Sequence, residues 1–317
     1  MALRTALRHT THDSWKSIRE VQEPRPTVGN HEGLIKVRRA PLNYRDVAIA
    51  TGKYPFSTKD QVVPGSDDAG DVVESWQTGL GGPVDGILRE YIALPAQSVV
   101  KIPESSSLSY AQWASVVCTG VTAWNAPFGA LPLKPGQNVL FQGTGGVSVT
   151  GLTLAKAADA IMIITSSSDD KLQYVKEKYG VDHVINYKKT PDWASEVQKI
   201  TAGRGVDFII ENGGSGTIKQ SLDAIAFGGT IALIGFLSIA AHEDMPDVAL
   251  LTLGKGANVR GIMIGSKEML EDAVCFIGSH DLAIPVEKTF NFGRDSVINA
   301  FDYMISGQHI GKICIDF

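Results

Sequence analysis

Short apolar runs alternate with amphipathic segments along the chain from residue 138 onward. The runs are rich in Val, Ile and Leu, a pattern typical of strands that are buried on both faces of a parallel sheet. Between them, apolar residues recur at helical spacing, as Leu172, Val175 and Tyr179 do. This alternation predicts a doubly wound α/β domain. The expected strands are 138–142, 160–165, 183–186, 206–211 and 230–235, and the expected helices are 146–157, 169–179, 193–201 and 217–227.

The first hundred residues show a different pattern. Runs of β-type residues at 33–40, 62–73 and 87–101 are interrupted by Pro and Gly. Such spacing predicts a small antiparallel barrel or sandwich. Residues 109–128 then predict a single helix with Ser109 as its N-cap, and this helix is expected to lead into the second domain.

The C-terminal stretch is expected to rejoin the first domain. Apolar residues recur at helical spacing between Val297 and Ile305, and the segment 312–317 after Gly311 has the pattern of a strand. The predicted domains are therefore 1–119 together with 266–317, and 120–265.

Composition narrows the class of protein. Hydrophobic residues make up 44% and charged residues 20% of the 317 residues, as in a folded globular chain. The net charge is -5, from 29 Lys and Arg against 34 Asp and Glu, and no basic run indicates a nucleic-acid partner. The sequence has no apolar stretch of the roughly 20 residues that a membrane span needs, and its start lacks the apolar block of a signal peptide. We therefore expect a cytoplasmic protein with neither a nucleic-acid nor a membrane partner.

The three cysteines, Cys118, Cys275 and Cys314, lie far apart and form no CxxC pair. Neither a disulfide framework nor a cysteine zinc site is indicated. A reducing compartment fits this pattern best.

The segment after the strand 138–142 is rich in glycine and leads directly into a predicted helix. This is the strand-turn-helix context of a dinucleotide-binding fingerprint. Gly143 permits the tight turn, and Gly145 lets the backbone approach a pyrophosphate at the helix N-terminus. Ser148 stands in place of the third glycine and is still small enough for close packing of helix on strand. The cofactor-binding residues predicted in this turn are Gly143, Gly145, Gly146, Val147 and Ser148.

The choice of nicotinamide cofactor depends on the end of the next strand, about 20 residues past the turn. An NAD-binding chain would carry Asp or Glu there, but this chain has Thr165 followed by three serines. The hydroxyls of Ser166 and Ser167 can donate to a 2′-phosphate, and Lys171 adds a compensating charge. We therefore predict NADPH. In the competing interpretation, a serine caps the next helix and Lys171 is a solvated surface residue.

The chain also carries a series of longer motifs. They are PLNYRD and TGKYP within 41–55, VPGSDDAGDVV at 63–73, DGILREYIALP at 85–95, CTGVTAWNA at 118–126, and, farther on, LKPGQNVLFQGTGGVS, TSSSDDKL, VDHVINY, GGTIALIGF, VRGIMIGS and HIGKICI. Together they cover nearly the whole chain and resemble the medium-chain dehydrogenase/reductase superfamily, above all its zinc-free quinone oxidoreductase and enoyl reductase branches. The resemblance implies a GroES-like β-barrel catalytic domain, a Rossmann domain that binds the cofactor, a small-molecule substrate and a homodimer.

The same resemblance permits a test of metal chemistry. Zinc-dependent members carry Cys at the position of Asn43, a His-Glu pair at Ser66 and Asp67, and a third ligand near Cys118. Only Cys118 could ligate here, and one thiolate does not hold a zinc ion that takes three protein ligands. We therefore expect no metal.

The expected reaction is hydride transfer from NADPH to an activated C=C bond or a quinone, because alcohol oxidation is less favoured without a Lewis acid. Such a reaction needs a hydrogen-bond donor and a proton. By resemblance, Tyr54 matches the proposed proton donor of enoyl reductases, and Tyr44 and Asn43 could bond the substrate oxygen. Both tyrosines could instead be structural. Two other functions stay open, namely a zinc-independent carbonyl reductase or alcohol dehydrogenase, and a non-catalytic NADPH-binding protein.

The resemblance assigns further residues to the cofactor. Thr122 should approach the nicotinamide, and Tyr187 should lie with Lys171 near the 2′-phosphate. Lys312 is expected to reach back toward the cofactor, with a surface lysine as the alternative. Asn212 and Gly213 are expected on the ribose side, and Gly235, Phe236 and Ile264 at the nicotinamide pocket.

One segment is shorter than the resemblance implies. After Glu74, family members continue through a strand pair that this sequence lacks before the segment that resembles 75–79. We expect either a barrel that is shortened near 74–80 or a sequence from which a mobile stretch at the cleft has been omitted.

Overall fold

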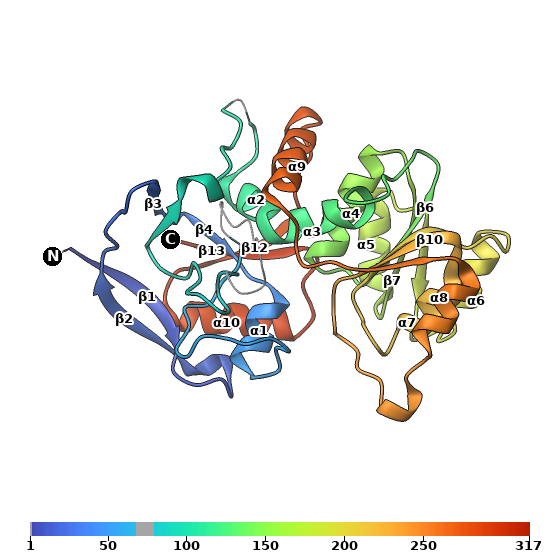
Figure 1. Ribbon diagram of the computed structural model, residues 1–317, viewed down its shortest axis with the longest axis horizontal. Coiled ribbons are helices and arrows are strands. Elements are labelled where there is room, and N and C mark those ends of the chain that lie inside the picture. Colours follow the sequence, from blue (N-terminus) through green and yellow to red (C-terminus); the bar gives the residue numbers. More distant parts are fainter. Residues whose placement is uncertain (1, 68–78, 105) are drawn as a thin grey trace. The chain divides into compact units, whose positions relative to one another are not determined.

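The computed structural model describes residues 2–67, 79–104 and 106–317 (Figure 1). The chain divides into two compact units, of which unit 1 is Met1–Val121 with Ile264–Phe317 and unit 2 is Thr122–Met263. Each of these limits lies within two residues of the one expected from the sequence.

Unit 2 is built on a parallel sheet of six strands, β6 (Asn138–Gln142), β7 (Ile161–Ser166), β8 (His183–Asn186), β9 (Val206–Glu211), β10 (Ile225–Leu233) and β11 (Asn258–Gly261). Their order in the sheet is β11-β10-β9-β6-β7-β8. The order therefore reverses between β6 and β9, as in doubly wound folds that bind dinucleotides. The predicted doubly wound α/β domain is confirmed.

Helices cover both faces of this sheet (Figure 1). They are α3 (Val121–Phe128), α4 (Gly146–Ala157), α5 (Asp169–Tyr179), α6 (Trp193–Ile200), α7 (Ile218–Ala224) and α8 (Val248–Lys255), with a short 3-10 turn η4 (His242–Asp244). α4 and α5 pack against β6, β7 and β8. α7 packs against α6 and α8, and these three helices contact β8, β9 and β10. A buried apolar cluster that includes Leu140, Ile209 and Leu222 joins α7 to the sheet.

The helix predicted at 217–227 ends earlier than expected. α7 stops at Ala224, and β10 begins at the next residue. Gly228 has a φ of +75°, a left-handed conformation that a helix does not contain and that glycine adopts without strain. The register of β10 against β9 shifts in the same place, between Ile225 and Thr230.

The described residues of unit 1 contain three small sheets. One pairs β1 (Leu3–His9) with β2 (Ile18–Pro24), and a second pairs β3 (Glu32–Lys36) with β5 (Tyr91–Pro95). The third contains β4 (Arg39–Pro41), β12 (Val286–Asn291) and β13 (Lys312–Asp316), with β13 in the middle. The C-terminal strand therefore returns to the first domain, as expected.

Short helices and turns complete unit 1. They are η1 (Trp15–Ser17), α1 (Tyr44–Ala50), η2 (Ala96–Ser98), α2 (Tyr110–Ala114), η3 (Val116–Gly120), α9 (Lys267–Ser279) and α10 (Arg294–Ile305). α10 buries Val297, Ala300 and Phe301 in the core of this unit. In the described part of the chain, no helix combines the length and the apolar character needed to cross a bilayer.

The strand predictions for unit 1 are only partly right. The run 33–40 splits into β3 and β4, and the run 87–101 supplies only β5 before the turn η2. Residues 62–67 form no strand. The remainder of that run, 68–73, lies outside the described residues, as does most of the segment 74–80 in which a shortened barrel is expected.

His9 is a buried titratable residue at the end of β1. Its side chain is fully buried, Nδ1 lies 3.3 Å from Ser17 Oγ, and Nε2 has no partner among the described residues. Burial, together with the nearby ring of His12, lowers the pKa of His9 to about 4.

We expect acid to destabilise the fold through His9. The folded chain keeps His9 neutral, whereas the unfolded chain protonates it near pH 6.5, so its contribution is complete above that pH and is lost as the pH falls toward 4. The loss amounts to about 3 kcal/mol. Denaturant unfolding between pH 4 and 6.5 measures the free energy of unfolding of wild type and of His9→Asn. The difference between the two isolates the contribution of His9, because the titration of other groups cancels. The exposed His280→Asn is the control, and a difference that stays constant with pH would contradict the expectation.

Candidate functional site

The glycine-rich turn lies where the strand order of unit 2 reverses. Gly143 follows β6 with a φ of +75°, which favours glycine. Gly145 is the N-cap of α4 in an extended conformation that any residue adopts, and a Cβ built on it meets nothing within 4 Å. The packing of the chain therefore does not demand glycine at this position. The open space above this backbone, at a helix N-terminus, fits the pyrophosphate of a dinucleotide.

Ser148 ties this turn to the neighbouring strand ends. Its Oγ donates to Gln142 O at 2.8 Å and accepts from Asn212 Nδ2 at 3.0 Å. Asn212 Nδ2 also donates to Gln142 O at 3.0 Å. The loop after β9 is thereby held against the turn, and the structure brings the predicted residues Ser148, Asn212 and Gly213 together. Gly146 and Val147 form the first turn of α4 and are half-buried.

Glu211, which the sequence analysis did not single out, organises the loop after β9. Its side chain is fully buried. One carboxylate oxygen accepts from the N–H groups of Gly213 at 2.8 Å and Gly214 at 3.0 Å, and the other accepts from Gln142 Nε2 at 2.7 Å. The hydroxyls of Thr217 and Ser221 also donate to it. The sequence signal that could have revealed this role is a charged residue directly after the apolar residues FII of a predicted buried strand.

The end of β7 carries the predicted serines. Ser166 is buried as the last residue of β7, and Ser167 is half-buried. Ser168 caps α5 by accepting the N–H of Lys171 at 3.4 Å. The N–H of Tyr187 donates to Ser166 O at 3.1 Å, which brings Tyr187 to the same sheet edge.

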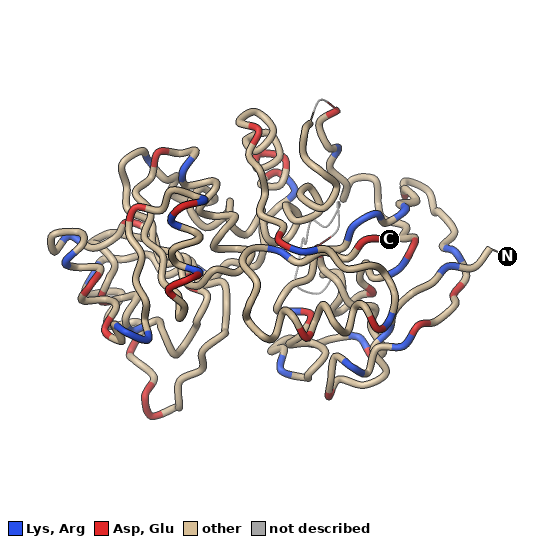
Figure 2. Tube along the Cα trace, turned by 180° about the vertical axis from the view of Figure 1, so that it is seen from behind, with Lys and Arg blue, Asp and Glu red and all other residues tan. Residues whose placement is uncertain are grey.

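Acidic and basic residues lie close together at the end of β7 and β8. Figure 2 shows that residues of both charges are spread along much of the chain. Asp169 begins α5, where it pairs with Lys189 and accepts from Asn186 Nδ2 at 2.7 Å. The bond from Lys189 holds the pKa of Asp169 below its usual range. Lys189 is a basic residue near the predicted phosphate end that the sequence analysis missed.

The other residues predicted for the cofactor occupy distinct places. Gly235 follows β10, where a Cβ would clash with the backbone of Asn212, so the close approach of two loops requires glycine. Phe236 is half-buried, and Thr122 is buried in α3. Ile264 has a φ of +59°, a rare conformation for a β-branched residue. Backbone strain of this kind is concentrated at functional sites.

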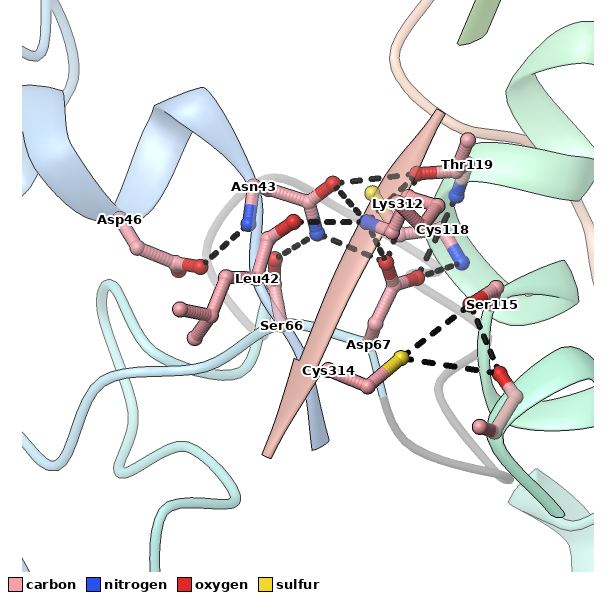
Figure 3. Close-up of polar contacts among 11 residues, drawn as sticks. Leu42, Asn43, Asp46, Ser66, Asp67, Ser115, Cys118, Thr119, Lys312 and Cys314 are labelled. Atoms are coloured by element: carbon pink, nitrogen blue, oxygen red, sulfur yellow. Dashed lines mark hydrogen bonds and ion pairs between the residues drawn. The ribbon is translucent and has the colours of Figure 1, made fainter. Parts of the chain in front are cut away.

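In unit 1, a buried lysine joins segments that lie far apart in the sequence (Figure 3). Lys312, at the start of β13, is 3% exposed. Its Nζ has three hydrogens, which are shared among four oxygens: Asp67 Oδ2 at 2.6 Å, Asn43 Oδ1 at 2.7 Å, Leu42 O at 2.8 Å and Thr119 Oγ1 at 3.0 Å. The alternative of an exposed surface lysine is therefore wrong.

Asp67 receives backbone donors from an irregular helix. Its side chain is fully buried, and its Oδ1 accepts from the N–H groups of Cys118 at 2.6 Å and Thr119 at 3.3 Å. Both residues lie in η3, a π-helical turn in which the N–H of Gly120 bonds to Ser115 O. The prediction of one helix over 109–128 is therefore wrong, because η3 separates α2 from α3. Single π turns are frequent at functional sites.

The amide of Asn43 is bonded on both sides. Its Oδ1 accepts from Lys312 and from Thr119 Oγ1 at 3.1 Å, and its Nδ2 donates to Ser66 Oγ at 3.1 Å and Asp67 Oδ2 at 2.9 Å. An amide has only two hydrogens to donate. A direct bond from Asn43 to a substrate would therefore require one of these bonds to break.

Tyr44 precedes Arg45 in the sequence, and Tyr54 is bonded to the Arg45 side chain. Tyr44 is the first residue of α1 and is 47% exposed. Arg45 Nε donates to Tyr54 Oη at 3.2 Å, and Arg45 Nη1 donates to Leu80 O at 2.7 Å. The ring of Tyr54 also meets that of Phe56 edge to face. The guanidinium of Arg45 therefore fixes the position of the Tyr54 hydroxyl.

Residues at the positions expected for zinc ligands do come together, but they do not suit zinc. Asn43 and Asp67 accept from the ammonium of Lys312, Ser66 accepts from Asn43, and the N–H of Cys118 donates to Asp67 (Figure 3). Burial raises the pKa of Cys118 to about 12, and Asn43 and Ser66 offer an amide and a hydroxyl in place of the thiolates and imidazoles that zinc prefers. Among the described residues, no group of three or more His, Cys, Asp and Glu side chains is placed to hold a metal.

Comparisons with known proteins give the family. The zinc-binding dehydrogenase family matches residues 146–279. A zinc-type alcohol dehydrogenase-like protein of Schizosaccharomyces pombe is 38% identical, over 98% of this chain and 99% of that protein. The chain belongs to the medium-chain dehydrogenase/reductase family. The resemblance expected from the motifs is thereby confirmed, and the chain is an oxidoreductase of this family.

Other members of the medium-chain family support this assignment. Prostaglandin reductase-3 of Mus musculus is 27% identical, over 92% of this chain and 83% of that protein. A crystal structure from Sinorhizobium meliloti 1021, named as a candidate alcohol dehydrogenase, has a TM-score of 0.87 and 30% identity over 100% of both chains. A mycobacterial protein solved with NADPH has a TM-score of 0.81 and 21% identity, over 99% of this chain and 100% of its own, and shares the fold.

Proposed function

We propose that this medium-chain oxidoreductase is a zinc-independent, NADPH-dependent reductase of activated C=C bonds or quinones. The observation that carries the proposal is that Asn43 and Asp67, at positions where zinc-dependent members carry Cys and Glu, bond to the Lys312 ammonium and to each other. A metal at this point would acidify an alcohol for oxidation. Reduction of a C=C bond next to a carbonyl needs a proton donor instead.

Unit 2 offers the groups that would hold the cofactor, which supplies the hydride when bound. The turn at 143–148 and the N-terminus of α4 suit the pyrophosphate. The hydroxyls of Ser166 and Ser167 suit a 2′-phosphate, with Lys171 and Tyr187 beside them. The further residues proposed for this cofactor are Thr122, Asn212, Gly213, Gly235, Phe236 and Ile264. Lys312, which the resemblance also assigned to the cofactor, is left out of this set because its ammonium is buried and bonded within unit 1.

Unit 1 offers the proton donor. We assign this role to Tyr54, because Arg45 donates to its hydroxyl oxygen and can stabilise the negative charge left when the proton is given to the substrate. Tyr44 is the second proposed contact to the substrate oxygen. Asn43 would act on that oxygen only if it gave up one of its bonds to Ser66 or Asp67.

A panel of enones, quinones, aldehydes and acyl thioesters with NADPH or NADH tests the proposal. Consumption of NADPH with the enones or quinones is the expected result. Turnover of aldehydes alone would favour a zinc-independent carbonyl reductase or alcohol dehydrogenase; the S. pombe and S. meliloti relatives are both named after alcohol dehydrogenases. Binding without consumption of any substrate would indicate a non-catalytic NADPH-binding protein.

The preference for NADPH is tested separately by Ser167→Asp. A carboxylate at this position would repel the 2′-phosphate and accept from the free hydroxyl of NADH. We expect the ratio of the NADPH and NADH dissociation constants to shift toward NADH by at least about tenfold, or 1.4 kcal/mol. Fluorescence titration of both cofactors measures the ratio, and Ser279→Asp on the exposed end of α9 is the control. An unchanged ratio would contradict the assignment of this serine.

The assembly and the compartment are also proposals. β11 is an edge strand, and the adjacent part of unit 2 exposes Leu250 and Leu253 of α8. An edge strand near exposed apolar side chains supports a homodimer through this side of the sheet. The free thiols of Cys118, Cys275 and Cys314 support a reducing compartment such as the cytoplasm.

A further inference from the structure

Two histidines of unit 1 lie close together at the end of β1. The strand ends at His9, and His12 follows in the turn that leads to η1. Their ring centres are 6.1 Å apart. His9 is fully buried and His12 is half-buried, and the Nε2 atom of each ring is buried without a hydrogen-bond partner among the described residues. Buried polar atoms are normally paired, so two unpaired ring nitrogens this near to each other need a physical reason.

The proton on the neutral ring of His12 is placed by the end of α1. Its Nδ1 lies 3.1 Å from Ile49 O. A carbonyl oxygen can only accept, so Nδ1 carries the hydrogen. A neutral imidazole has one N–H group, and Nε2 of His12 is therefore a bare lone pair.

The proton on His9 is placed by its neighbour Ser17. The hydroxyl of Ser17 donates its single hydrogen to Thr11 O at 2.8 Å. Towards His9 Nδ1, which lies 3.3 Å away, the same oxygen can therefore only accept. Burial lowers the pKa of His9 to about 4, so its ring is neutral at pH 7. Nε2 of His9 is thus a bare lone pair as well.

Two bare lone pairs cannot bond to each other, but one metal ion can accept both. Histidines that bind metals almost always donate their other ring N–H to a neighbouring oxygen, and both rings do so here. Two imidazoles on one zinc ion, each with a nitrogen about 2.0–2.1 Å from it, have ring centres roughly 5 to 6.5 Å apart. The observed 6.1 Å lies within this range. A water molecule that donates one hydrogen to each ring is the competing occupant.

The chain supplies two ligands to such an ion. Among the described residues, no third His, Cys, Asp or Glu side chain joins the pair. Zinc takes four ligands in its structural sites, so water would complete the coordination here. The affinity should therefore be lower than that of a site with four protein ligands.

We propose that His9 and His12 form a structural site for a divalent transition-metal ion, which their Nε2 atoms bind. Imidazole suits zinc and copper in particular. Because His12 is bonded to Ile49 O, the ion would tie the end of β1 to the C-terminal end of α1. The site shares no residue with the cluster around Lys312, and the proposal stands whether or not the chain reduces C=C bonds.

Titration of the chelator-stripped chain with zinc tests the site. Calorimetry near neutral pH should show that zinc binds to wild type, and that His12→Asn weakens this binding at least tenfold. His280→Asn, at the exposed end of α9, is the matched control and should bind zinc like wild type. Equal affinity of wild type and His12→Asn, or no binding by wild type, would overturn the proposal and favour water between the two rings.

Copper(II) gives a second readout that reports the ligands directly. It binds nitrogen ligands more tightly than zinc does. The exposed thiol of Cys275 is first removed by Cys275→Ser, so that it neither binds nor reduces the copper. With one equivalent of copper, the electron paramagnetic resonance spectrum should show coupling to two imidazole nitrogens, and His12→Asn or His9→Asn should each remove one. A spectrum that neither substitution changes would overturn the proposal.

Discussion

Replacing Tyr54 with phenylalanine is expected to lower kcat for a responsive enone or quinone by a hundredfold or more, with little change in KM. General acid catalysis contributes about 10² to 10⁴ in rate, and Tyr54→Phe removes the hydroxyl that Arg45 bonds at 3.2 Å. The ring remains to pack against Phe56. The fold should therefore survive, so a fall in kcat would report the loss of the proton donor.

Two tyrosine variants serve as controls for this experiment. Tyr110→Phe, at the exposed first residue of α2, should leave kcat unchanged. Tyr44→Phe should have a smaller effect than Tyr54→Phe, because it is the Tyr54 hydroxyl oxygen to which Arg45 donates and whose negative charge it can stabilise. If Tyr44→Phe abolishes turnover while Tyr54→Phe does not, the proton donor has been assigned to the wrong tyrosine.

Replacing Glu211 with alanine is expected to destabilise unit 2 by about 4 kcal/mol or more. The change leaves the N–H groups of Gly213 and Gly214 and the amide of Gln142 without their buried acceptor, and each such loss costs about 1 to 3 kcal/mol. Denaturant unfolding measures the free energy of unfolding. Since the same loop carries Asn212 and Gly213, cofactor affinity should fall as well.

Glu196→Ala is the matched control for Glu211. Glu196 is in α6, where it forms a partly exposed pair with Lys199, so its loss should cost less than about 1 kcal/mol. Glu211→Gln should fall between the two, because an amide keeps the shape of the side chain but can accept on one side only. Similar stabilities for Glu211→Ala and Glu196→Ala would show that the buried bonds of Glu211 are not what holds the loop.

Sequence patterns predicted unit 2 well because its signals are local. Each buried strand and each amphipathic helix carries its own periodicity, and the turn at 143–148 is recognised by its glycines together with the strand before it and the helix after it. The errors made in unit 2 were also local. The helix predicted at 217–227 ends at Ala224, after which β10 begins, and Glu211 was overlooked directly after the apolar residues 208–210.

Unit 1 was harder to predict because its site depends on contacts between distant segments. Lys312 meets Asn43 across 269 positions and Asp67 across 245. No periodicity records such contacts, and the resemblance indicated only that Asn43, Ser66, Asp67 and Cys118 should lie near one another. The π turn η3 also left no mark in the pattern, because one extra residue per turn leaves the composition of a helix unchanged.

The long separation between Asp67 and Lys312 sets an order of events during synthesis. Unit 2 is one continuous stretch of chain, so it can fold as soon as it leaves the ribosome, whereas Asp67 must wait for a partner that is made 245 residues later. At the usual speed of translation this wait lasts roughly 12 to 50 seconds. During that time the segment around Asp67 carries an uncompensated negative charge that is best left in water. The synthesis of β13 therefore both completes a sheet and supplies the lysine beside which Asp67 is buried.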